Sequence, residues 1–287
     1  MSDKGHIFCG FKHPKVEREI HWEKGSIAFI EDGDTISSRR FWAAKIPIFG
    51  YRPDDDLFFH EEPQHRRRYL NWLCSYLDLS YMDLVTHYEQ TLKQRNAALR
   101  DQRTAEKEFL VWEQELANLG ARLYHLRTDT VLRLCKQYAR LWECMDCEPA
   151  FLRYVPGGSG DVLEIQKQLA IDRPKDIQRG WTRFGPHRDD LLIERYQRPI
   201  KDSGSQGYRK LAIILLSAAC ALTVTTKESK THLFYLDDIE GELDDQNEVK
   251  LFKLLADQPF QLFLTAVRKP QVLINTRQEN QLQWVEL

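Results

Sequence analysis

The sequence predicts an α/β body with a mixed sheet, into which an all-helical lobe is inserted. Strand and helix patterns alternate between residues 190 and 265, which is typical of a sheet that contains parallel strands. Residues 6–35 alternate apolar and charged side chains as antiparallel strands do, whereas residues 63–148 carry apolar side chains at helical spacing. We therefore expect residues 1–62 and 149–287 to form the body and residues 63–148 to form the lobe.

Composition excludes several classes of protein. The chain has 287 residues, of which 42% are hydrophobic and 29% charged, so it can bury a sizeable core and is not disordered. The N-terminus lacks the apolar segment of a secretory signal, and no run of 18 apolar residues is present to span a bilayer. The six cysteines are scattered. We expect a cytoplasmic protein in a reducing compartment with no membrane association.

The charge is unevenly distributed although the net charge is only −2. Residues 86–140 are net basic and residues 231–257 are net acidic. A nucleic-acid-binding protein of this composition would have to concentrate its positive charge locally. The basic stretch can equally be an ordinary solvated face of a helix.

Short strands are predicted in the first part of the body. Residues 16–22 alternate apolar and charged side chains, and Lys24-Gly25 and Asp32-Gly33 mark turns around them. Residues 46–51 form another short apolar run that ends before Pro53.

The lobe is predicted to contain four helices. Pro63 suits the first turn of a helix, and Ser80 can cap the next one through its side chain. Leucines at helical spacing predict a third helix at residues 116–126, and a similar pattern predicts a fourth at 131–145.

The exit from the lobe is marked by Pro149 and the glycine-rich residues 156–160. Beyond it we expect, in order, a strand at 190–194, a helix at 208–222, a strand at 233–236, a helix at 245–256 and a strand at 261–265.

Two adjacent carboxylates follow the strand at 233–236. Ligands of an open α/β sheet bind beyond the carboxyl ends of its strands, and carboxylate oxygens are preferred by hard divalent cations. Asp237 and Asp238 would repel each other unless a metal or a proton neutralised them. The alternative is an acidic strand end that simply faces solvent.

A second pattern precedes the helix at 208–222. Ser205 and Gly207 are small residues at a predicted helix N-terminus, where backbone N–H groups and the helix dipole favour a phosphate. Any glycine-containing start of a helix shares this chemistry, so the pattern by itself is weak.

A third pattern gathers titratable side chains within residues 181–190. Gly185-Pro186 forces a turn, and His187 with two arginines and two aspartates crowds the same stretch. His187 can equally be a structural residue with its polar atoms satisfied.

Together these patterns resemble the RecF proteins of bacterial recombinational repair, whose ATPase head is related to the ABC and SMC ATPases. Residues 185–190 match the central motif of that family, and residues 233–238 resemble its Walker B strand. Ser205-x-Gly207-x-x-Lys210 resembles the ABC signature, with Tyr208 where glutamine is usual. Further matches are Pro53-Asp54, Pro63 with Arg66-Arg67 and Tyr69-Leu70, residues 92–97, Trp112, and Glu242-Leu243-Asp244, which resembles the D-loop.

The resemblance implies an ABC-type, P-loop NTPase-like head with ATP and Mg²⁺ as cofactors. Asp237 would bind Mg²⁺ through water, and Asp238 would be the catalytic residue that orients or deprotonates the attacking water. Ser205, Gly207 and Lys210 would bind, across a homodimer, the nucleotide held by the partner, next to Asp244 of the D-loop.

The resemblance also implies a weak DNA-dependent ATPase that acts as an ATP-controlled dimer clamp on single-stranded and gapped DNA. Such a clamp would load recombinase together with recombination-mediator proteins, and would support replication and the SOS response. The candidate DNA contacts are Arg66, Arg67, Lys93 and Arg95, each of which can equally form an intramolecular ion pair.

One motif of the family is not found. A P-loop requires G-x-x-x-x-G-K-[ST], and the nearest match, Lys230-Thr231, follows Glu228-Ser229 in place of glycine. The family carries this motif near its N-terminus, so the head is expected to be incomplete there. Either the sequence is a truncated form of a longer protein, which the retained Asp237 and Ser205 favour, or it is a P-loop-less relative, which Tyr208 favours.

Three other functions are compatible with parts of the sequence. The first is a non-enzymatic scaffold that binds DNA or a mediator protein through the helical lobe. The second is a metal-dependent nuclease built on Asp237/Asp238 and Asp244/Asp245, which lacks an evident second ligand set. The third is a zinc site at Cys144, Cys147 and Cys135, although these cysteines fit a helix core better.

Overall fold

The computed structural model describes residues 9–13, 16–23, 26–31, 34–36, 48–56, 58, 62–101, 106–225, 232–237 and 243–265. The chain divides into two compact units, Met1–Ile48 and Phe49–Leu287, and each is described by itself. The three-part division at residues 62 and 148 that the sequence suggests stays a prediction.

The first unit contains an antiparallel sheet in the order β1-β2-β3-β4. In this sheet Ile20 of β2 lies opposite Cys9 of β1 and Phe29 of β3. The antiparallel strands predicted for residues 6–35 are therefore confirmed. The four strands are β1 (Cys9–His13), β2 (Val16–Glu23), β3 (Ser26–Glu31) and β4 (Asp34–Ile36).

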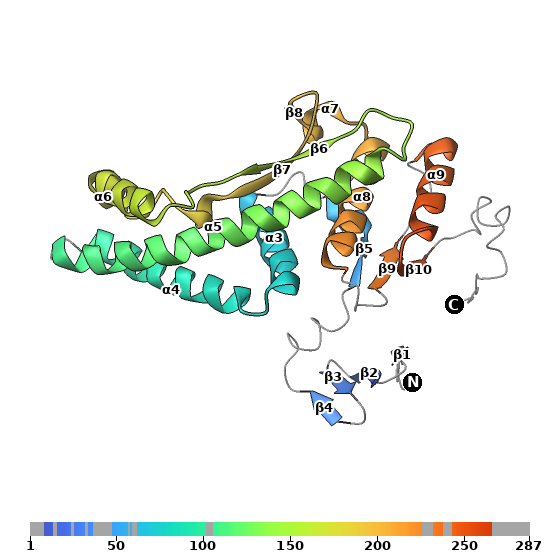
Figure 1. The fold of residues 1–287 in the computed structure, drawn as a ribbon, viewed down its shortest axis with the longest axis horizontal. Coiled ribbons are helices and arrows are strands. Elements are labelled where there is room, and N and C mark those ends of the chain that lie inside the picture. Colours follow the sequence, from blue (N-terminus) through green and yellow to red (C-terminus); the bar gives the residue numbers. More distant parts are fainter. Residues whose placement is uncertain are drawn as a thin grey trace, which may run out of the picture. The chain divides into compact units, whose positions relative to one another are not determined.

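The second unit contains a sheet in the order β10-β9-β5 that is covered by helices (Figure 1). Strands β9 (His232–Leu236) and β10 (Phe260–Leu264) are parallel, as the strand and helix alternation predicts. Strand β5 (Ile48–Tyr51) lies on the other side of β9. The associated helices are α8 (Gln206–Val224) and α9 (Asp245–Ala256), which confirm the predicted helices at these positions.

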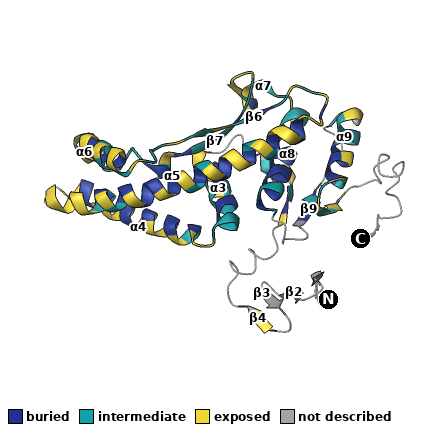
Figure 2. Ribbon diagram, viewed as in Figure 1, coloured by how far each residue is buried: buried dark blue, intermediate teal, exposed yellow. Residues whose placement is uncertain are grey.

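Helix α8 forms the centre of the core of this unit. It is long and apolar enough to cross a membrane, but 72% of its most apolar 18-residue window is buried inside the protein. Figure 2 shows this burial along α8. The helix thus has the environment of a core helix, although its length and apolar composition exceed the sequence expectation that no apolar run is long enough to span a bilayer.

Gly50 allows β5 to pack closely on its neighbours. A Cβ atom at this position would lie 2.2 Å from the carbonyl oxygen of Tyr235 in β9. On the other side, the Gly50 N–H donates to the hydroxyl of Ser217 in α8 at 2.9 Å. Any side chain at residue 50 would therefore separate the strand from the sheet.

The lobe is built around one long helix rather than two short ones. Helix α5 (Glu106–Trp142) is continuous for 37 residues, so the predicted break between residues 126 and 131 is wrong. The polar residues in that stretch do not interrupt the helix, because buried Arg127 and Thr130 find partners within the protein. The other lobe helices predicted from sequence are α3 (Pro63–Leu77) and α4 (Tyr81–Arg100), and α3 begins at Pro63 as expected.

The start of α4 differs from the prediction. Ser80 makes no side-chain cap, because its own backbone is already in the helical region. Instead, the carboxylate of Asp78 accepts hydrogen bonds from the backbone N–H and the hydroxyl of Ser80, at 2.8 and 2.7 Å.

Two elements were not predicted from the sequence. Helix α6 (Val162–Arg179) begins at Asp161, whose carboxylate accepts from the N–H groups of Leu163 and Glu164, and it packs against α5. Strand β6 (Phe151–Val155) pairs with β7 (Asp190–Arg195), which was predicted, and β7 pairs with β8 (Arg198–Pro199). The short elements η1 (Pro53–Asp56), η2 (Pro186–Arg188) and α7 (Ile200–Ser203) complete the unit.

We expect Gly50→Ala to destabilise the second unit by about 2 kcal/mol or more, because the new Cβ would overlap the Tyr235 carbonyl. Urea denaturation measures this loss. The matched control is Gly120→Ala within α5, where a Cβ would meet Pro186 at an ordinary 3.5 Å and would not be destabilising. Equal effects of the two substitutions would contradict the close approach of β5.

Candidate ATPase site and the buried polar network

The signature-like residues lie at the exposed N-terminus of α8. Ser205 is the N-cap, and its hydroxyl accepts a hydrogen bond from the Tyr208 N–H at 3.2 Å. Ser205 is exposed and Gly207 is partly exposed, so the first turn of the helix is accessible. A helix N-terminus offers backbone donors and a positive dipole end, which is the chemistry that the sequence predicts here for a phosphate.

Lys210 points into the protein rather than toward solvent. It is 4% exposed, and its ammonium lies 5.5 Å from the ring centroid of Tyr51 at the end of β5. Its predicted contact with a nucleotide stays untested, and the position suits a residue that supports α8 from inside. Ser205 and Gly207 are thus the accessible members of the signature.

Asp237 directly follows β9, beyond the carboxyl ends of the sheet strands. Its backbone N–H donates to the carbonyl of Tyr51 at 2.9 Å, which places the ends of β5 and β9 together. Its Oδ1 accepts from the hydroxyl of Thr265, just after β10, at 2.5 Å. A carboxylate at this edge is an oxygen ligand of the kind that Mg²⁺ prefers, so the residue fits the expected role. Asp238, the predicted catalytic residue, lies outside the described residues.

Asp244, the predicted D-loop aspartate, caps helix α9. Its carboxylate accepts from the backbone N–H of Asn247 at 2.9 Å and from the side-chain amide of Asn247 at 2.6 Å. These hydrogen bonds lower the pKa of Asp244. Its charge is therefore kept at the surface, at the start of the helix that follows the Walker B-like strand.

Tyr208, the departure from the usual signature, is anchored through its side chain. Its hydroxyl donates to the carbonyl of Glu148 at 2.6 Å, and its ring stacks on Trp142 with a centroid distance of 5.4 Å. The guanidinium of Arg195 lies over the ring, 4.2 Å from its centroid. Burial raises the pKa of Tyr208, so the hydroxyl remains a donor.

The motif at residues 185–190 forms a buried junction rather than an open site. Asp189 is 1% exposed, and its carboxylate accepts from Arg127 at 2.6 Å, from the Tyr154 hydroxyl at 2.5 Å and from the Gly157 N–H at 2.7 Å. The next carboxylate, Asp190, forms a two-point ion pair with Arg66 at 2.7 and 2.9 Å.

His187 has the structural environment that the sequence left as an alternative. One ring nitrogen, Nε2, faces the Thr182 carbonyl at 2.9 Å and must donate to it. The other, Nδ1, therefore accepts from the Tyr88 hydroxyl at 2.8 Å. Burial lowers the pKa of His187 to about 4, so the ring is neutral.

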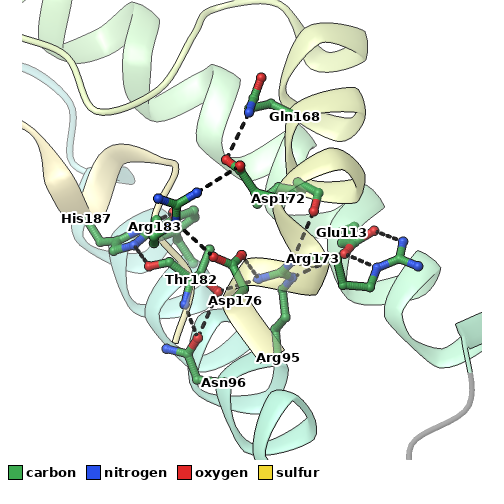
Figure 3. A network of polar contacts seen from close by, with 12 residues as sticks. Arg95, Asn96, Glu113, Gln168, Asp172, Arg173, Asp176, Thr182, Arg183 and His187 are labelled. Carbon is green, nitrogen blue, oxygen red and sulfur yellow. Dashed lines mark hydrogen bonds and ion pairs between the residues drawn. The ribbon is translucent and has the colours of Figure 1, made fainter. Parts of the chain in front are cut away.

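A second buried network joins helices α4, α5 and α6 (Figure 3). Arg95 of α4 is fully buried and pairs with Glu113 of α5 at 3.0 Å and with Asp176 of α6 at 2.9 Å. Its guanidinium also donates to the Thr182 hydroxyl at 2.7 Å. Arg173 of α6 adds a second pair to Glu113 at 2.6 Å.

The four candidate DNA contacts differ in accessibility. Arg66 and Arg95 are buried and form the intramolecular ion pairs that were their alternative role. Arg67 is half-buried, and its guanidinium donates to the Asp189 carbonyl at 2.9 Å. Lys93 is exposed on α4.

Neither network was predicted from the sequence. A usable signal existed, because Glu113 and Arg127 occupy positions on the apolar stripe of α5 that also contains Leu116, Leu123 and Leu134. A charged residue at a core position of a helical repeat indicates a buried ionic partner.

The described residues contain no group of three or more His, Cys, Asp or Glu side chains placed to hold a metal ion. Cys135 and Cys147 pack against the core, as expected. Cys144 is exposed, so the expectation that it belongs to the core is wrong.

The described part of the second unit is an α/β body with a mixed set of strands, from which long helices extend. No model of a protein family matches the chain. The chain is similar to the DNA replication and repair protein RecF of Coxiella burnetii (strain Dugway 5J108-111), with 28% identity over 253 residues, covering 88% of this chain and 70% of that protein. It is also similar to RecF of Shewanella sediminis, with 26% identity over 279 residues, covering 95% of this chain and 76% of that protein.

Solved structures agree with this similarity. The recombination mediator protein RecF of the RecFOR pathway, solved with ATP, has a TM-score of 0.73 and 22% identity, covering 89% of this chain and 71% of that one. A second RecF structure, RecF-ATPrS, has a TM-score of 0.70 and 23% identity over 88% of this chain and 71% of that chain. The resemblance to RecF is thereby confirmed, and the fold is that of the RecF ATPase.

We expect Arg95→Met to destabilise the protein by about 3 kcal/mol, because buried Asp176 would lose its 2.9 Å ion pair and keep only the longer 3.5 Å pair with Arg183. The control is Lys93→Met on the exposed side of the same helix, which should change stability by no more than about 0.5 kcal/mol. Both are measured by urea denaturation, and a small effect of Arg95→Met would show that the network contributes little.

His187 gives the protein a defined pH dependence. The unfolded chain binds a proton at a histidine pKa of about 6.5, whereas the folded pKa is about 4. Stability is therefore lost as pH falls from about 6.5 to about 4, by up to about 3 kcal/mol, and this contribution is level outside that window. The variant His187→Gln should lose less stability than the wild type between pH 7 and pH 4.5, and parallel losses would contradict the assignment.

Proposed function

We propose that the chain is a RecF-like DNA recombination and repair protein that binds single-stranded and gapped DNA as an ATP-controlled dimer clamp. The observation that supports this most directly is the accessible Ser205–Gly207 end of α8 on a head with the RecF fold. In such a clamp, bound nucleotide joins two heads around DNA and hydrolysis releases them. Recombinase loading with mediator proteins, replication and the SOS response would depend on this cycle.

Roles in this clamp can be proposed for individual residues. Asp237 would hold Mg²⁺ through water, and the ion would supply charge stabilisation for the phosphates. Asp238 would orient or deprotonate the attacking water. Ser205 and Gly207 would contact the γ-phosphate of a nucleotide held by the partner subunit, because their backbone donors face outward from the helix N-terminus.

DNA contacts are proposed for Lys93 and Arg67, which retain exposed surface. Phosphate contacts of this type position a protein on DNA without reading its sequence. Arg66 and Arg95 are left out of this proposal because their guanidinium groups are engaged inside the protein.

A second candidate function is a scaffold that binds DNA or a mediator protein without ATP turnover. One observation favours it: the 287 residues contain no G-x-x-x-x-G-K-[ST] motif to cradle the β- and γ-phosphates. Both candidates share the DNA-binding step and differ in whether nucleotide changes it.

The two are separated by measuring affinity for a gapped duplex with and without Mg-ATP, at about 50 and about 200 mM salt. The clamp predicts tighter binding and self-association with Mg-ATP, and predicts that Ser205→Arg removes this response but keeps ATP-independent binding. Salt-sensitive binding that ignores Mg-ATP supports the scaffold. Absence of DNA binding at low salt would overturn both candidates.

A further inference from the structure

Tyr208 ties the accessible end of α8 to three other parts of the protein. Its ring stacks on Trp142 at the C-terminal end of α5, and its hydroxyl donates to the Glu148 carbonyl in the segment after that helix. The guanidinium of Arg195, at the end of β7, also lies over the ring. The side chain is thus fixed by contacts of three different kinds.

The backbone of the same residue fixes the cap. The Tyr208 N–H donates to the Ser205 hydroxyl, so the residue whose side chain attaches the first turn to the core is also hydrogen-bonded to the cap through its backbone. The backbone just before the cap also packs closely on this side chain, because a Cβ at Gly204 would lie 3.2 Å from the Tyr208 ring. Arg209 adds a hydrogen bond from its guanidinium to the Gly204 carbonyl at 3.2 Å.

Helix α5 connects this anchor to the lobe. Along one continuous helix, Glu113 belongs to the Arg95 network, Arg127 holds Asp189, and Trp142 stacks on Tyr208. Glu113 and Arg127 of the buried networks therefore lie on the same continuous helix as Trp142, the residue on which Tyr208 stacks.

We infer that Tyr208 is a positioning residue that aims the Ser205–Gly207 backbone at a partner subunit's nucleotide and couples this aim to the placement of α5. The inference rests on the proposed function, because it assigns the residue that controls the signature of that same site. Tyr208 itself touches no nucleotide in this role; it acts through Ser205 and through the first turn of α8.

The test compares Tyr208→Ala and Tyr208→Phe with Tyr196→Ala as the matched control. Tyr196 is 62% exposed and also lies beside Arg195, whose guanidinium carbon is 4.9 Å from the centroid of the Tyr196 ring. Sedimentation velocity gives the Mg-ATP concentration needed for self-association, and hydrogen exchange reports the amides of residues 206–209. Melting temperatures confirm that each variant is folded.

Tyr208→Ala should raise the required Mg-ATP concentration about tenfold or more and accelerate exchange at residues 206–209. Tyr208→Phe keeps the stacking and loses one hydrogen bond, so its shift should be about fivefold. Tyr196→Ala should match the wild type. If Tyr208→Ala does not fold, Tyr208→Gln replaces it, since it removes the ring and keeps a polar side chain.

One result overturns the inference while leaving the proposed function standing: a Tyr208→Ala protein whose Mg-ATP response equals that of the wild type. Faster exchange at residues 206–209 in such a protein would make Tyr208 a purely structural anchor. A wild-type protein that ignores Mg-ATP overturns the proposed function instead, and the inference with it.

Discussion

The buried carboxylate of Asp189 determines how the elements around it can pack, because a charge removed from water must be compensated by donors at short range. Its donors come from α5, from β6 and from the glycine-rich turn after β6. Asp190, its neighbour, holds α3 through Arg66. Two adjacent residues at the start of β7 therefore hold two helices, α3 and α5, at the base of the lobe.

The second buried cluster, around Arg95, has the opposite arrangement of charges. There a buried cation, Arg95, is surrounded by carboxylates from α5 and α6. Because ion pairs of this kind are costly to break and contribute little when compared with apolar packing, their main consequence is a unique arrangement of the helices. Helix α5 takes part in both clusters, so each cluster connects its other helices to α5.

Local signals in the sequence were sufficient for much of this architecture. Pro63 marks the start of α3, and the bounds of α9 match the predicted helix, since these depend on residues close to the helix ends. Residues 127–130 suggested a break in α5 because they are polar, and the charge of buried Arg127 is compensated by partners distant in sequence. Helix α6 escaped notice for a related reason, since Pro174 lies within it and its buried Asp172 and Asp176 replace part of an apolar stripe.

The residues of the candidate site fall into the same two groups, those marked by local sequence signals and those that depend on partners distant in sequence. Asp237, Asp244, Ser205 and Gly207 could be proposed as site residues because they lie at the ends of strands and helices, which local patterns mark. The inward orientation of Lys210 and the anchoring of Tyr208 could not, because both depend on side chains from Tyr51, Trp142 and Arg195 that only the tertiary structure brings near.

The unbroken length of α5 gives the protein a mechanical property. At 1.5 Å per residue, its 37 residues span about 55 Å, so the helix acts as a lever with its fulcrum among the elements of the head. A tilt of about 5° at the Trp142 end would move the opposite end by about 5 Å, which is close to the rise of one helical turn along its axis. A small displacement at the Trp142 end of α5 would therefore produce a larger displacement at its opposite end. A force applied at that opposite end would act with a larger magnitude on the elements of the head.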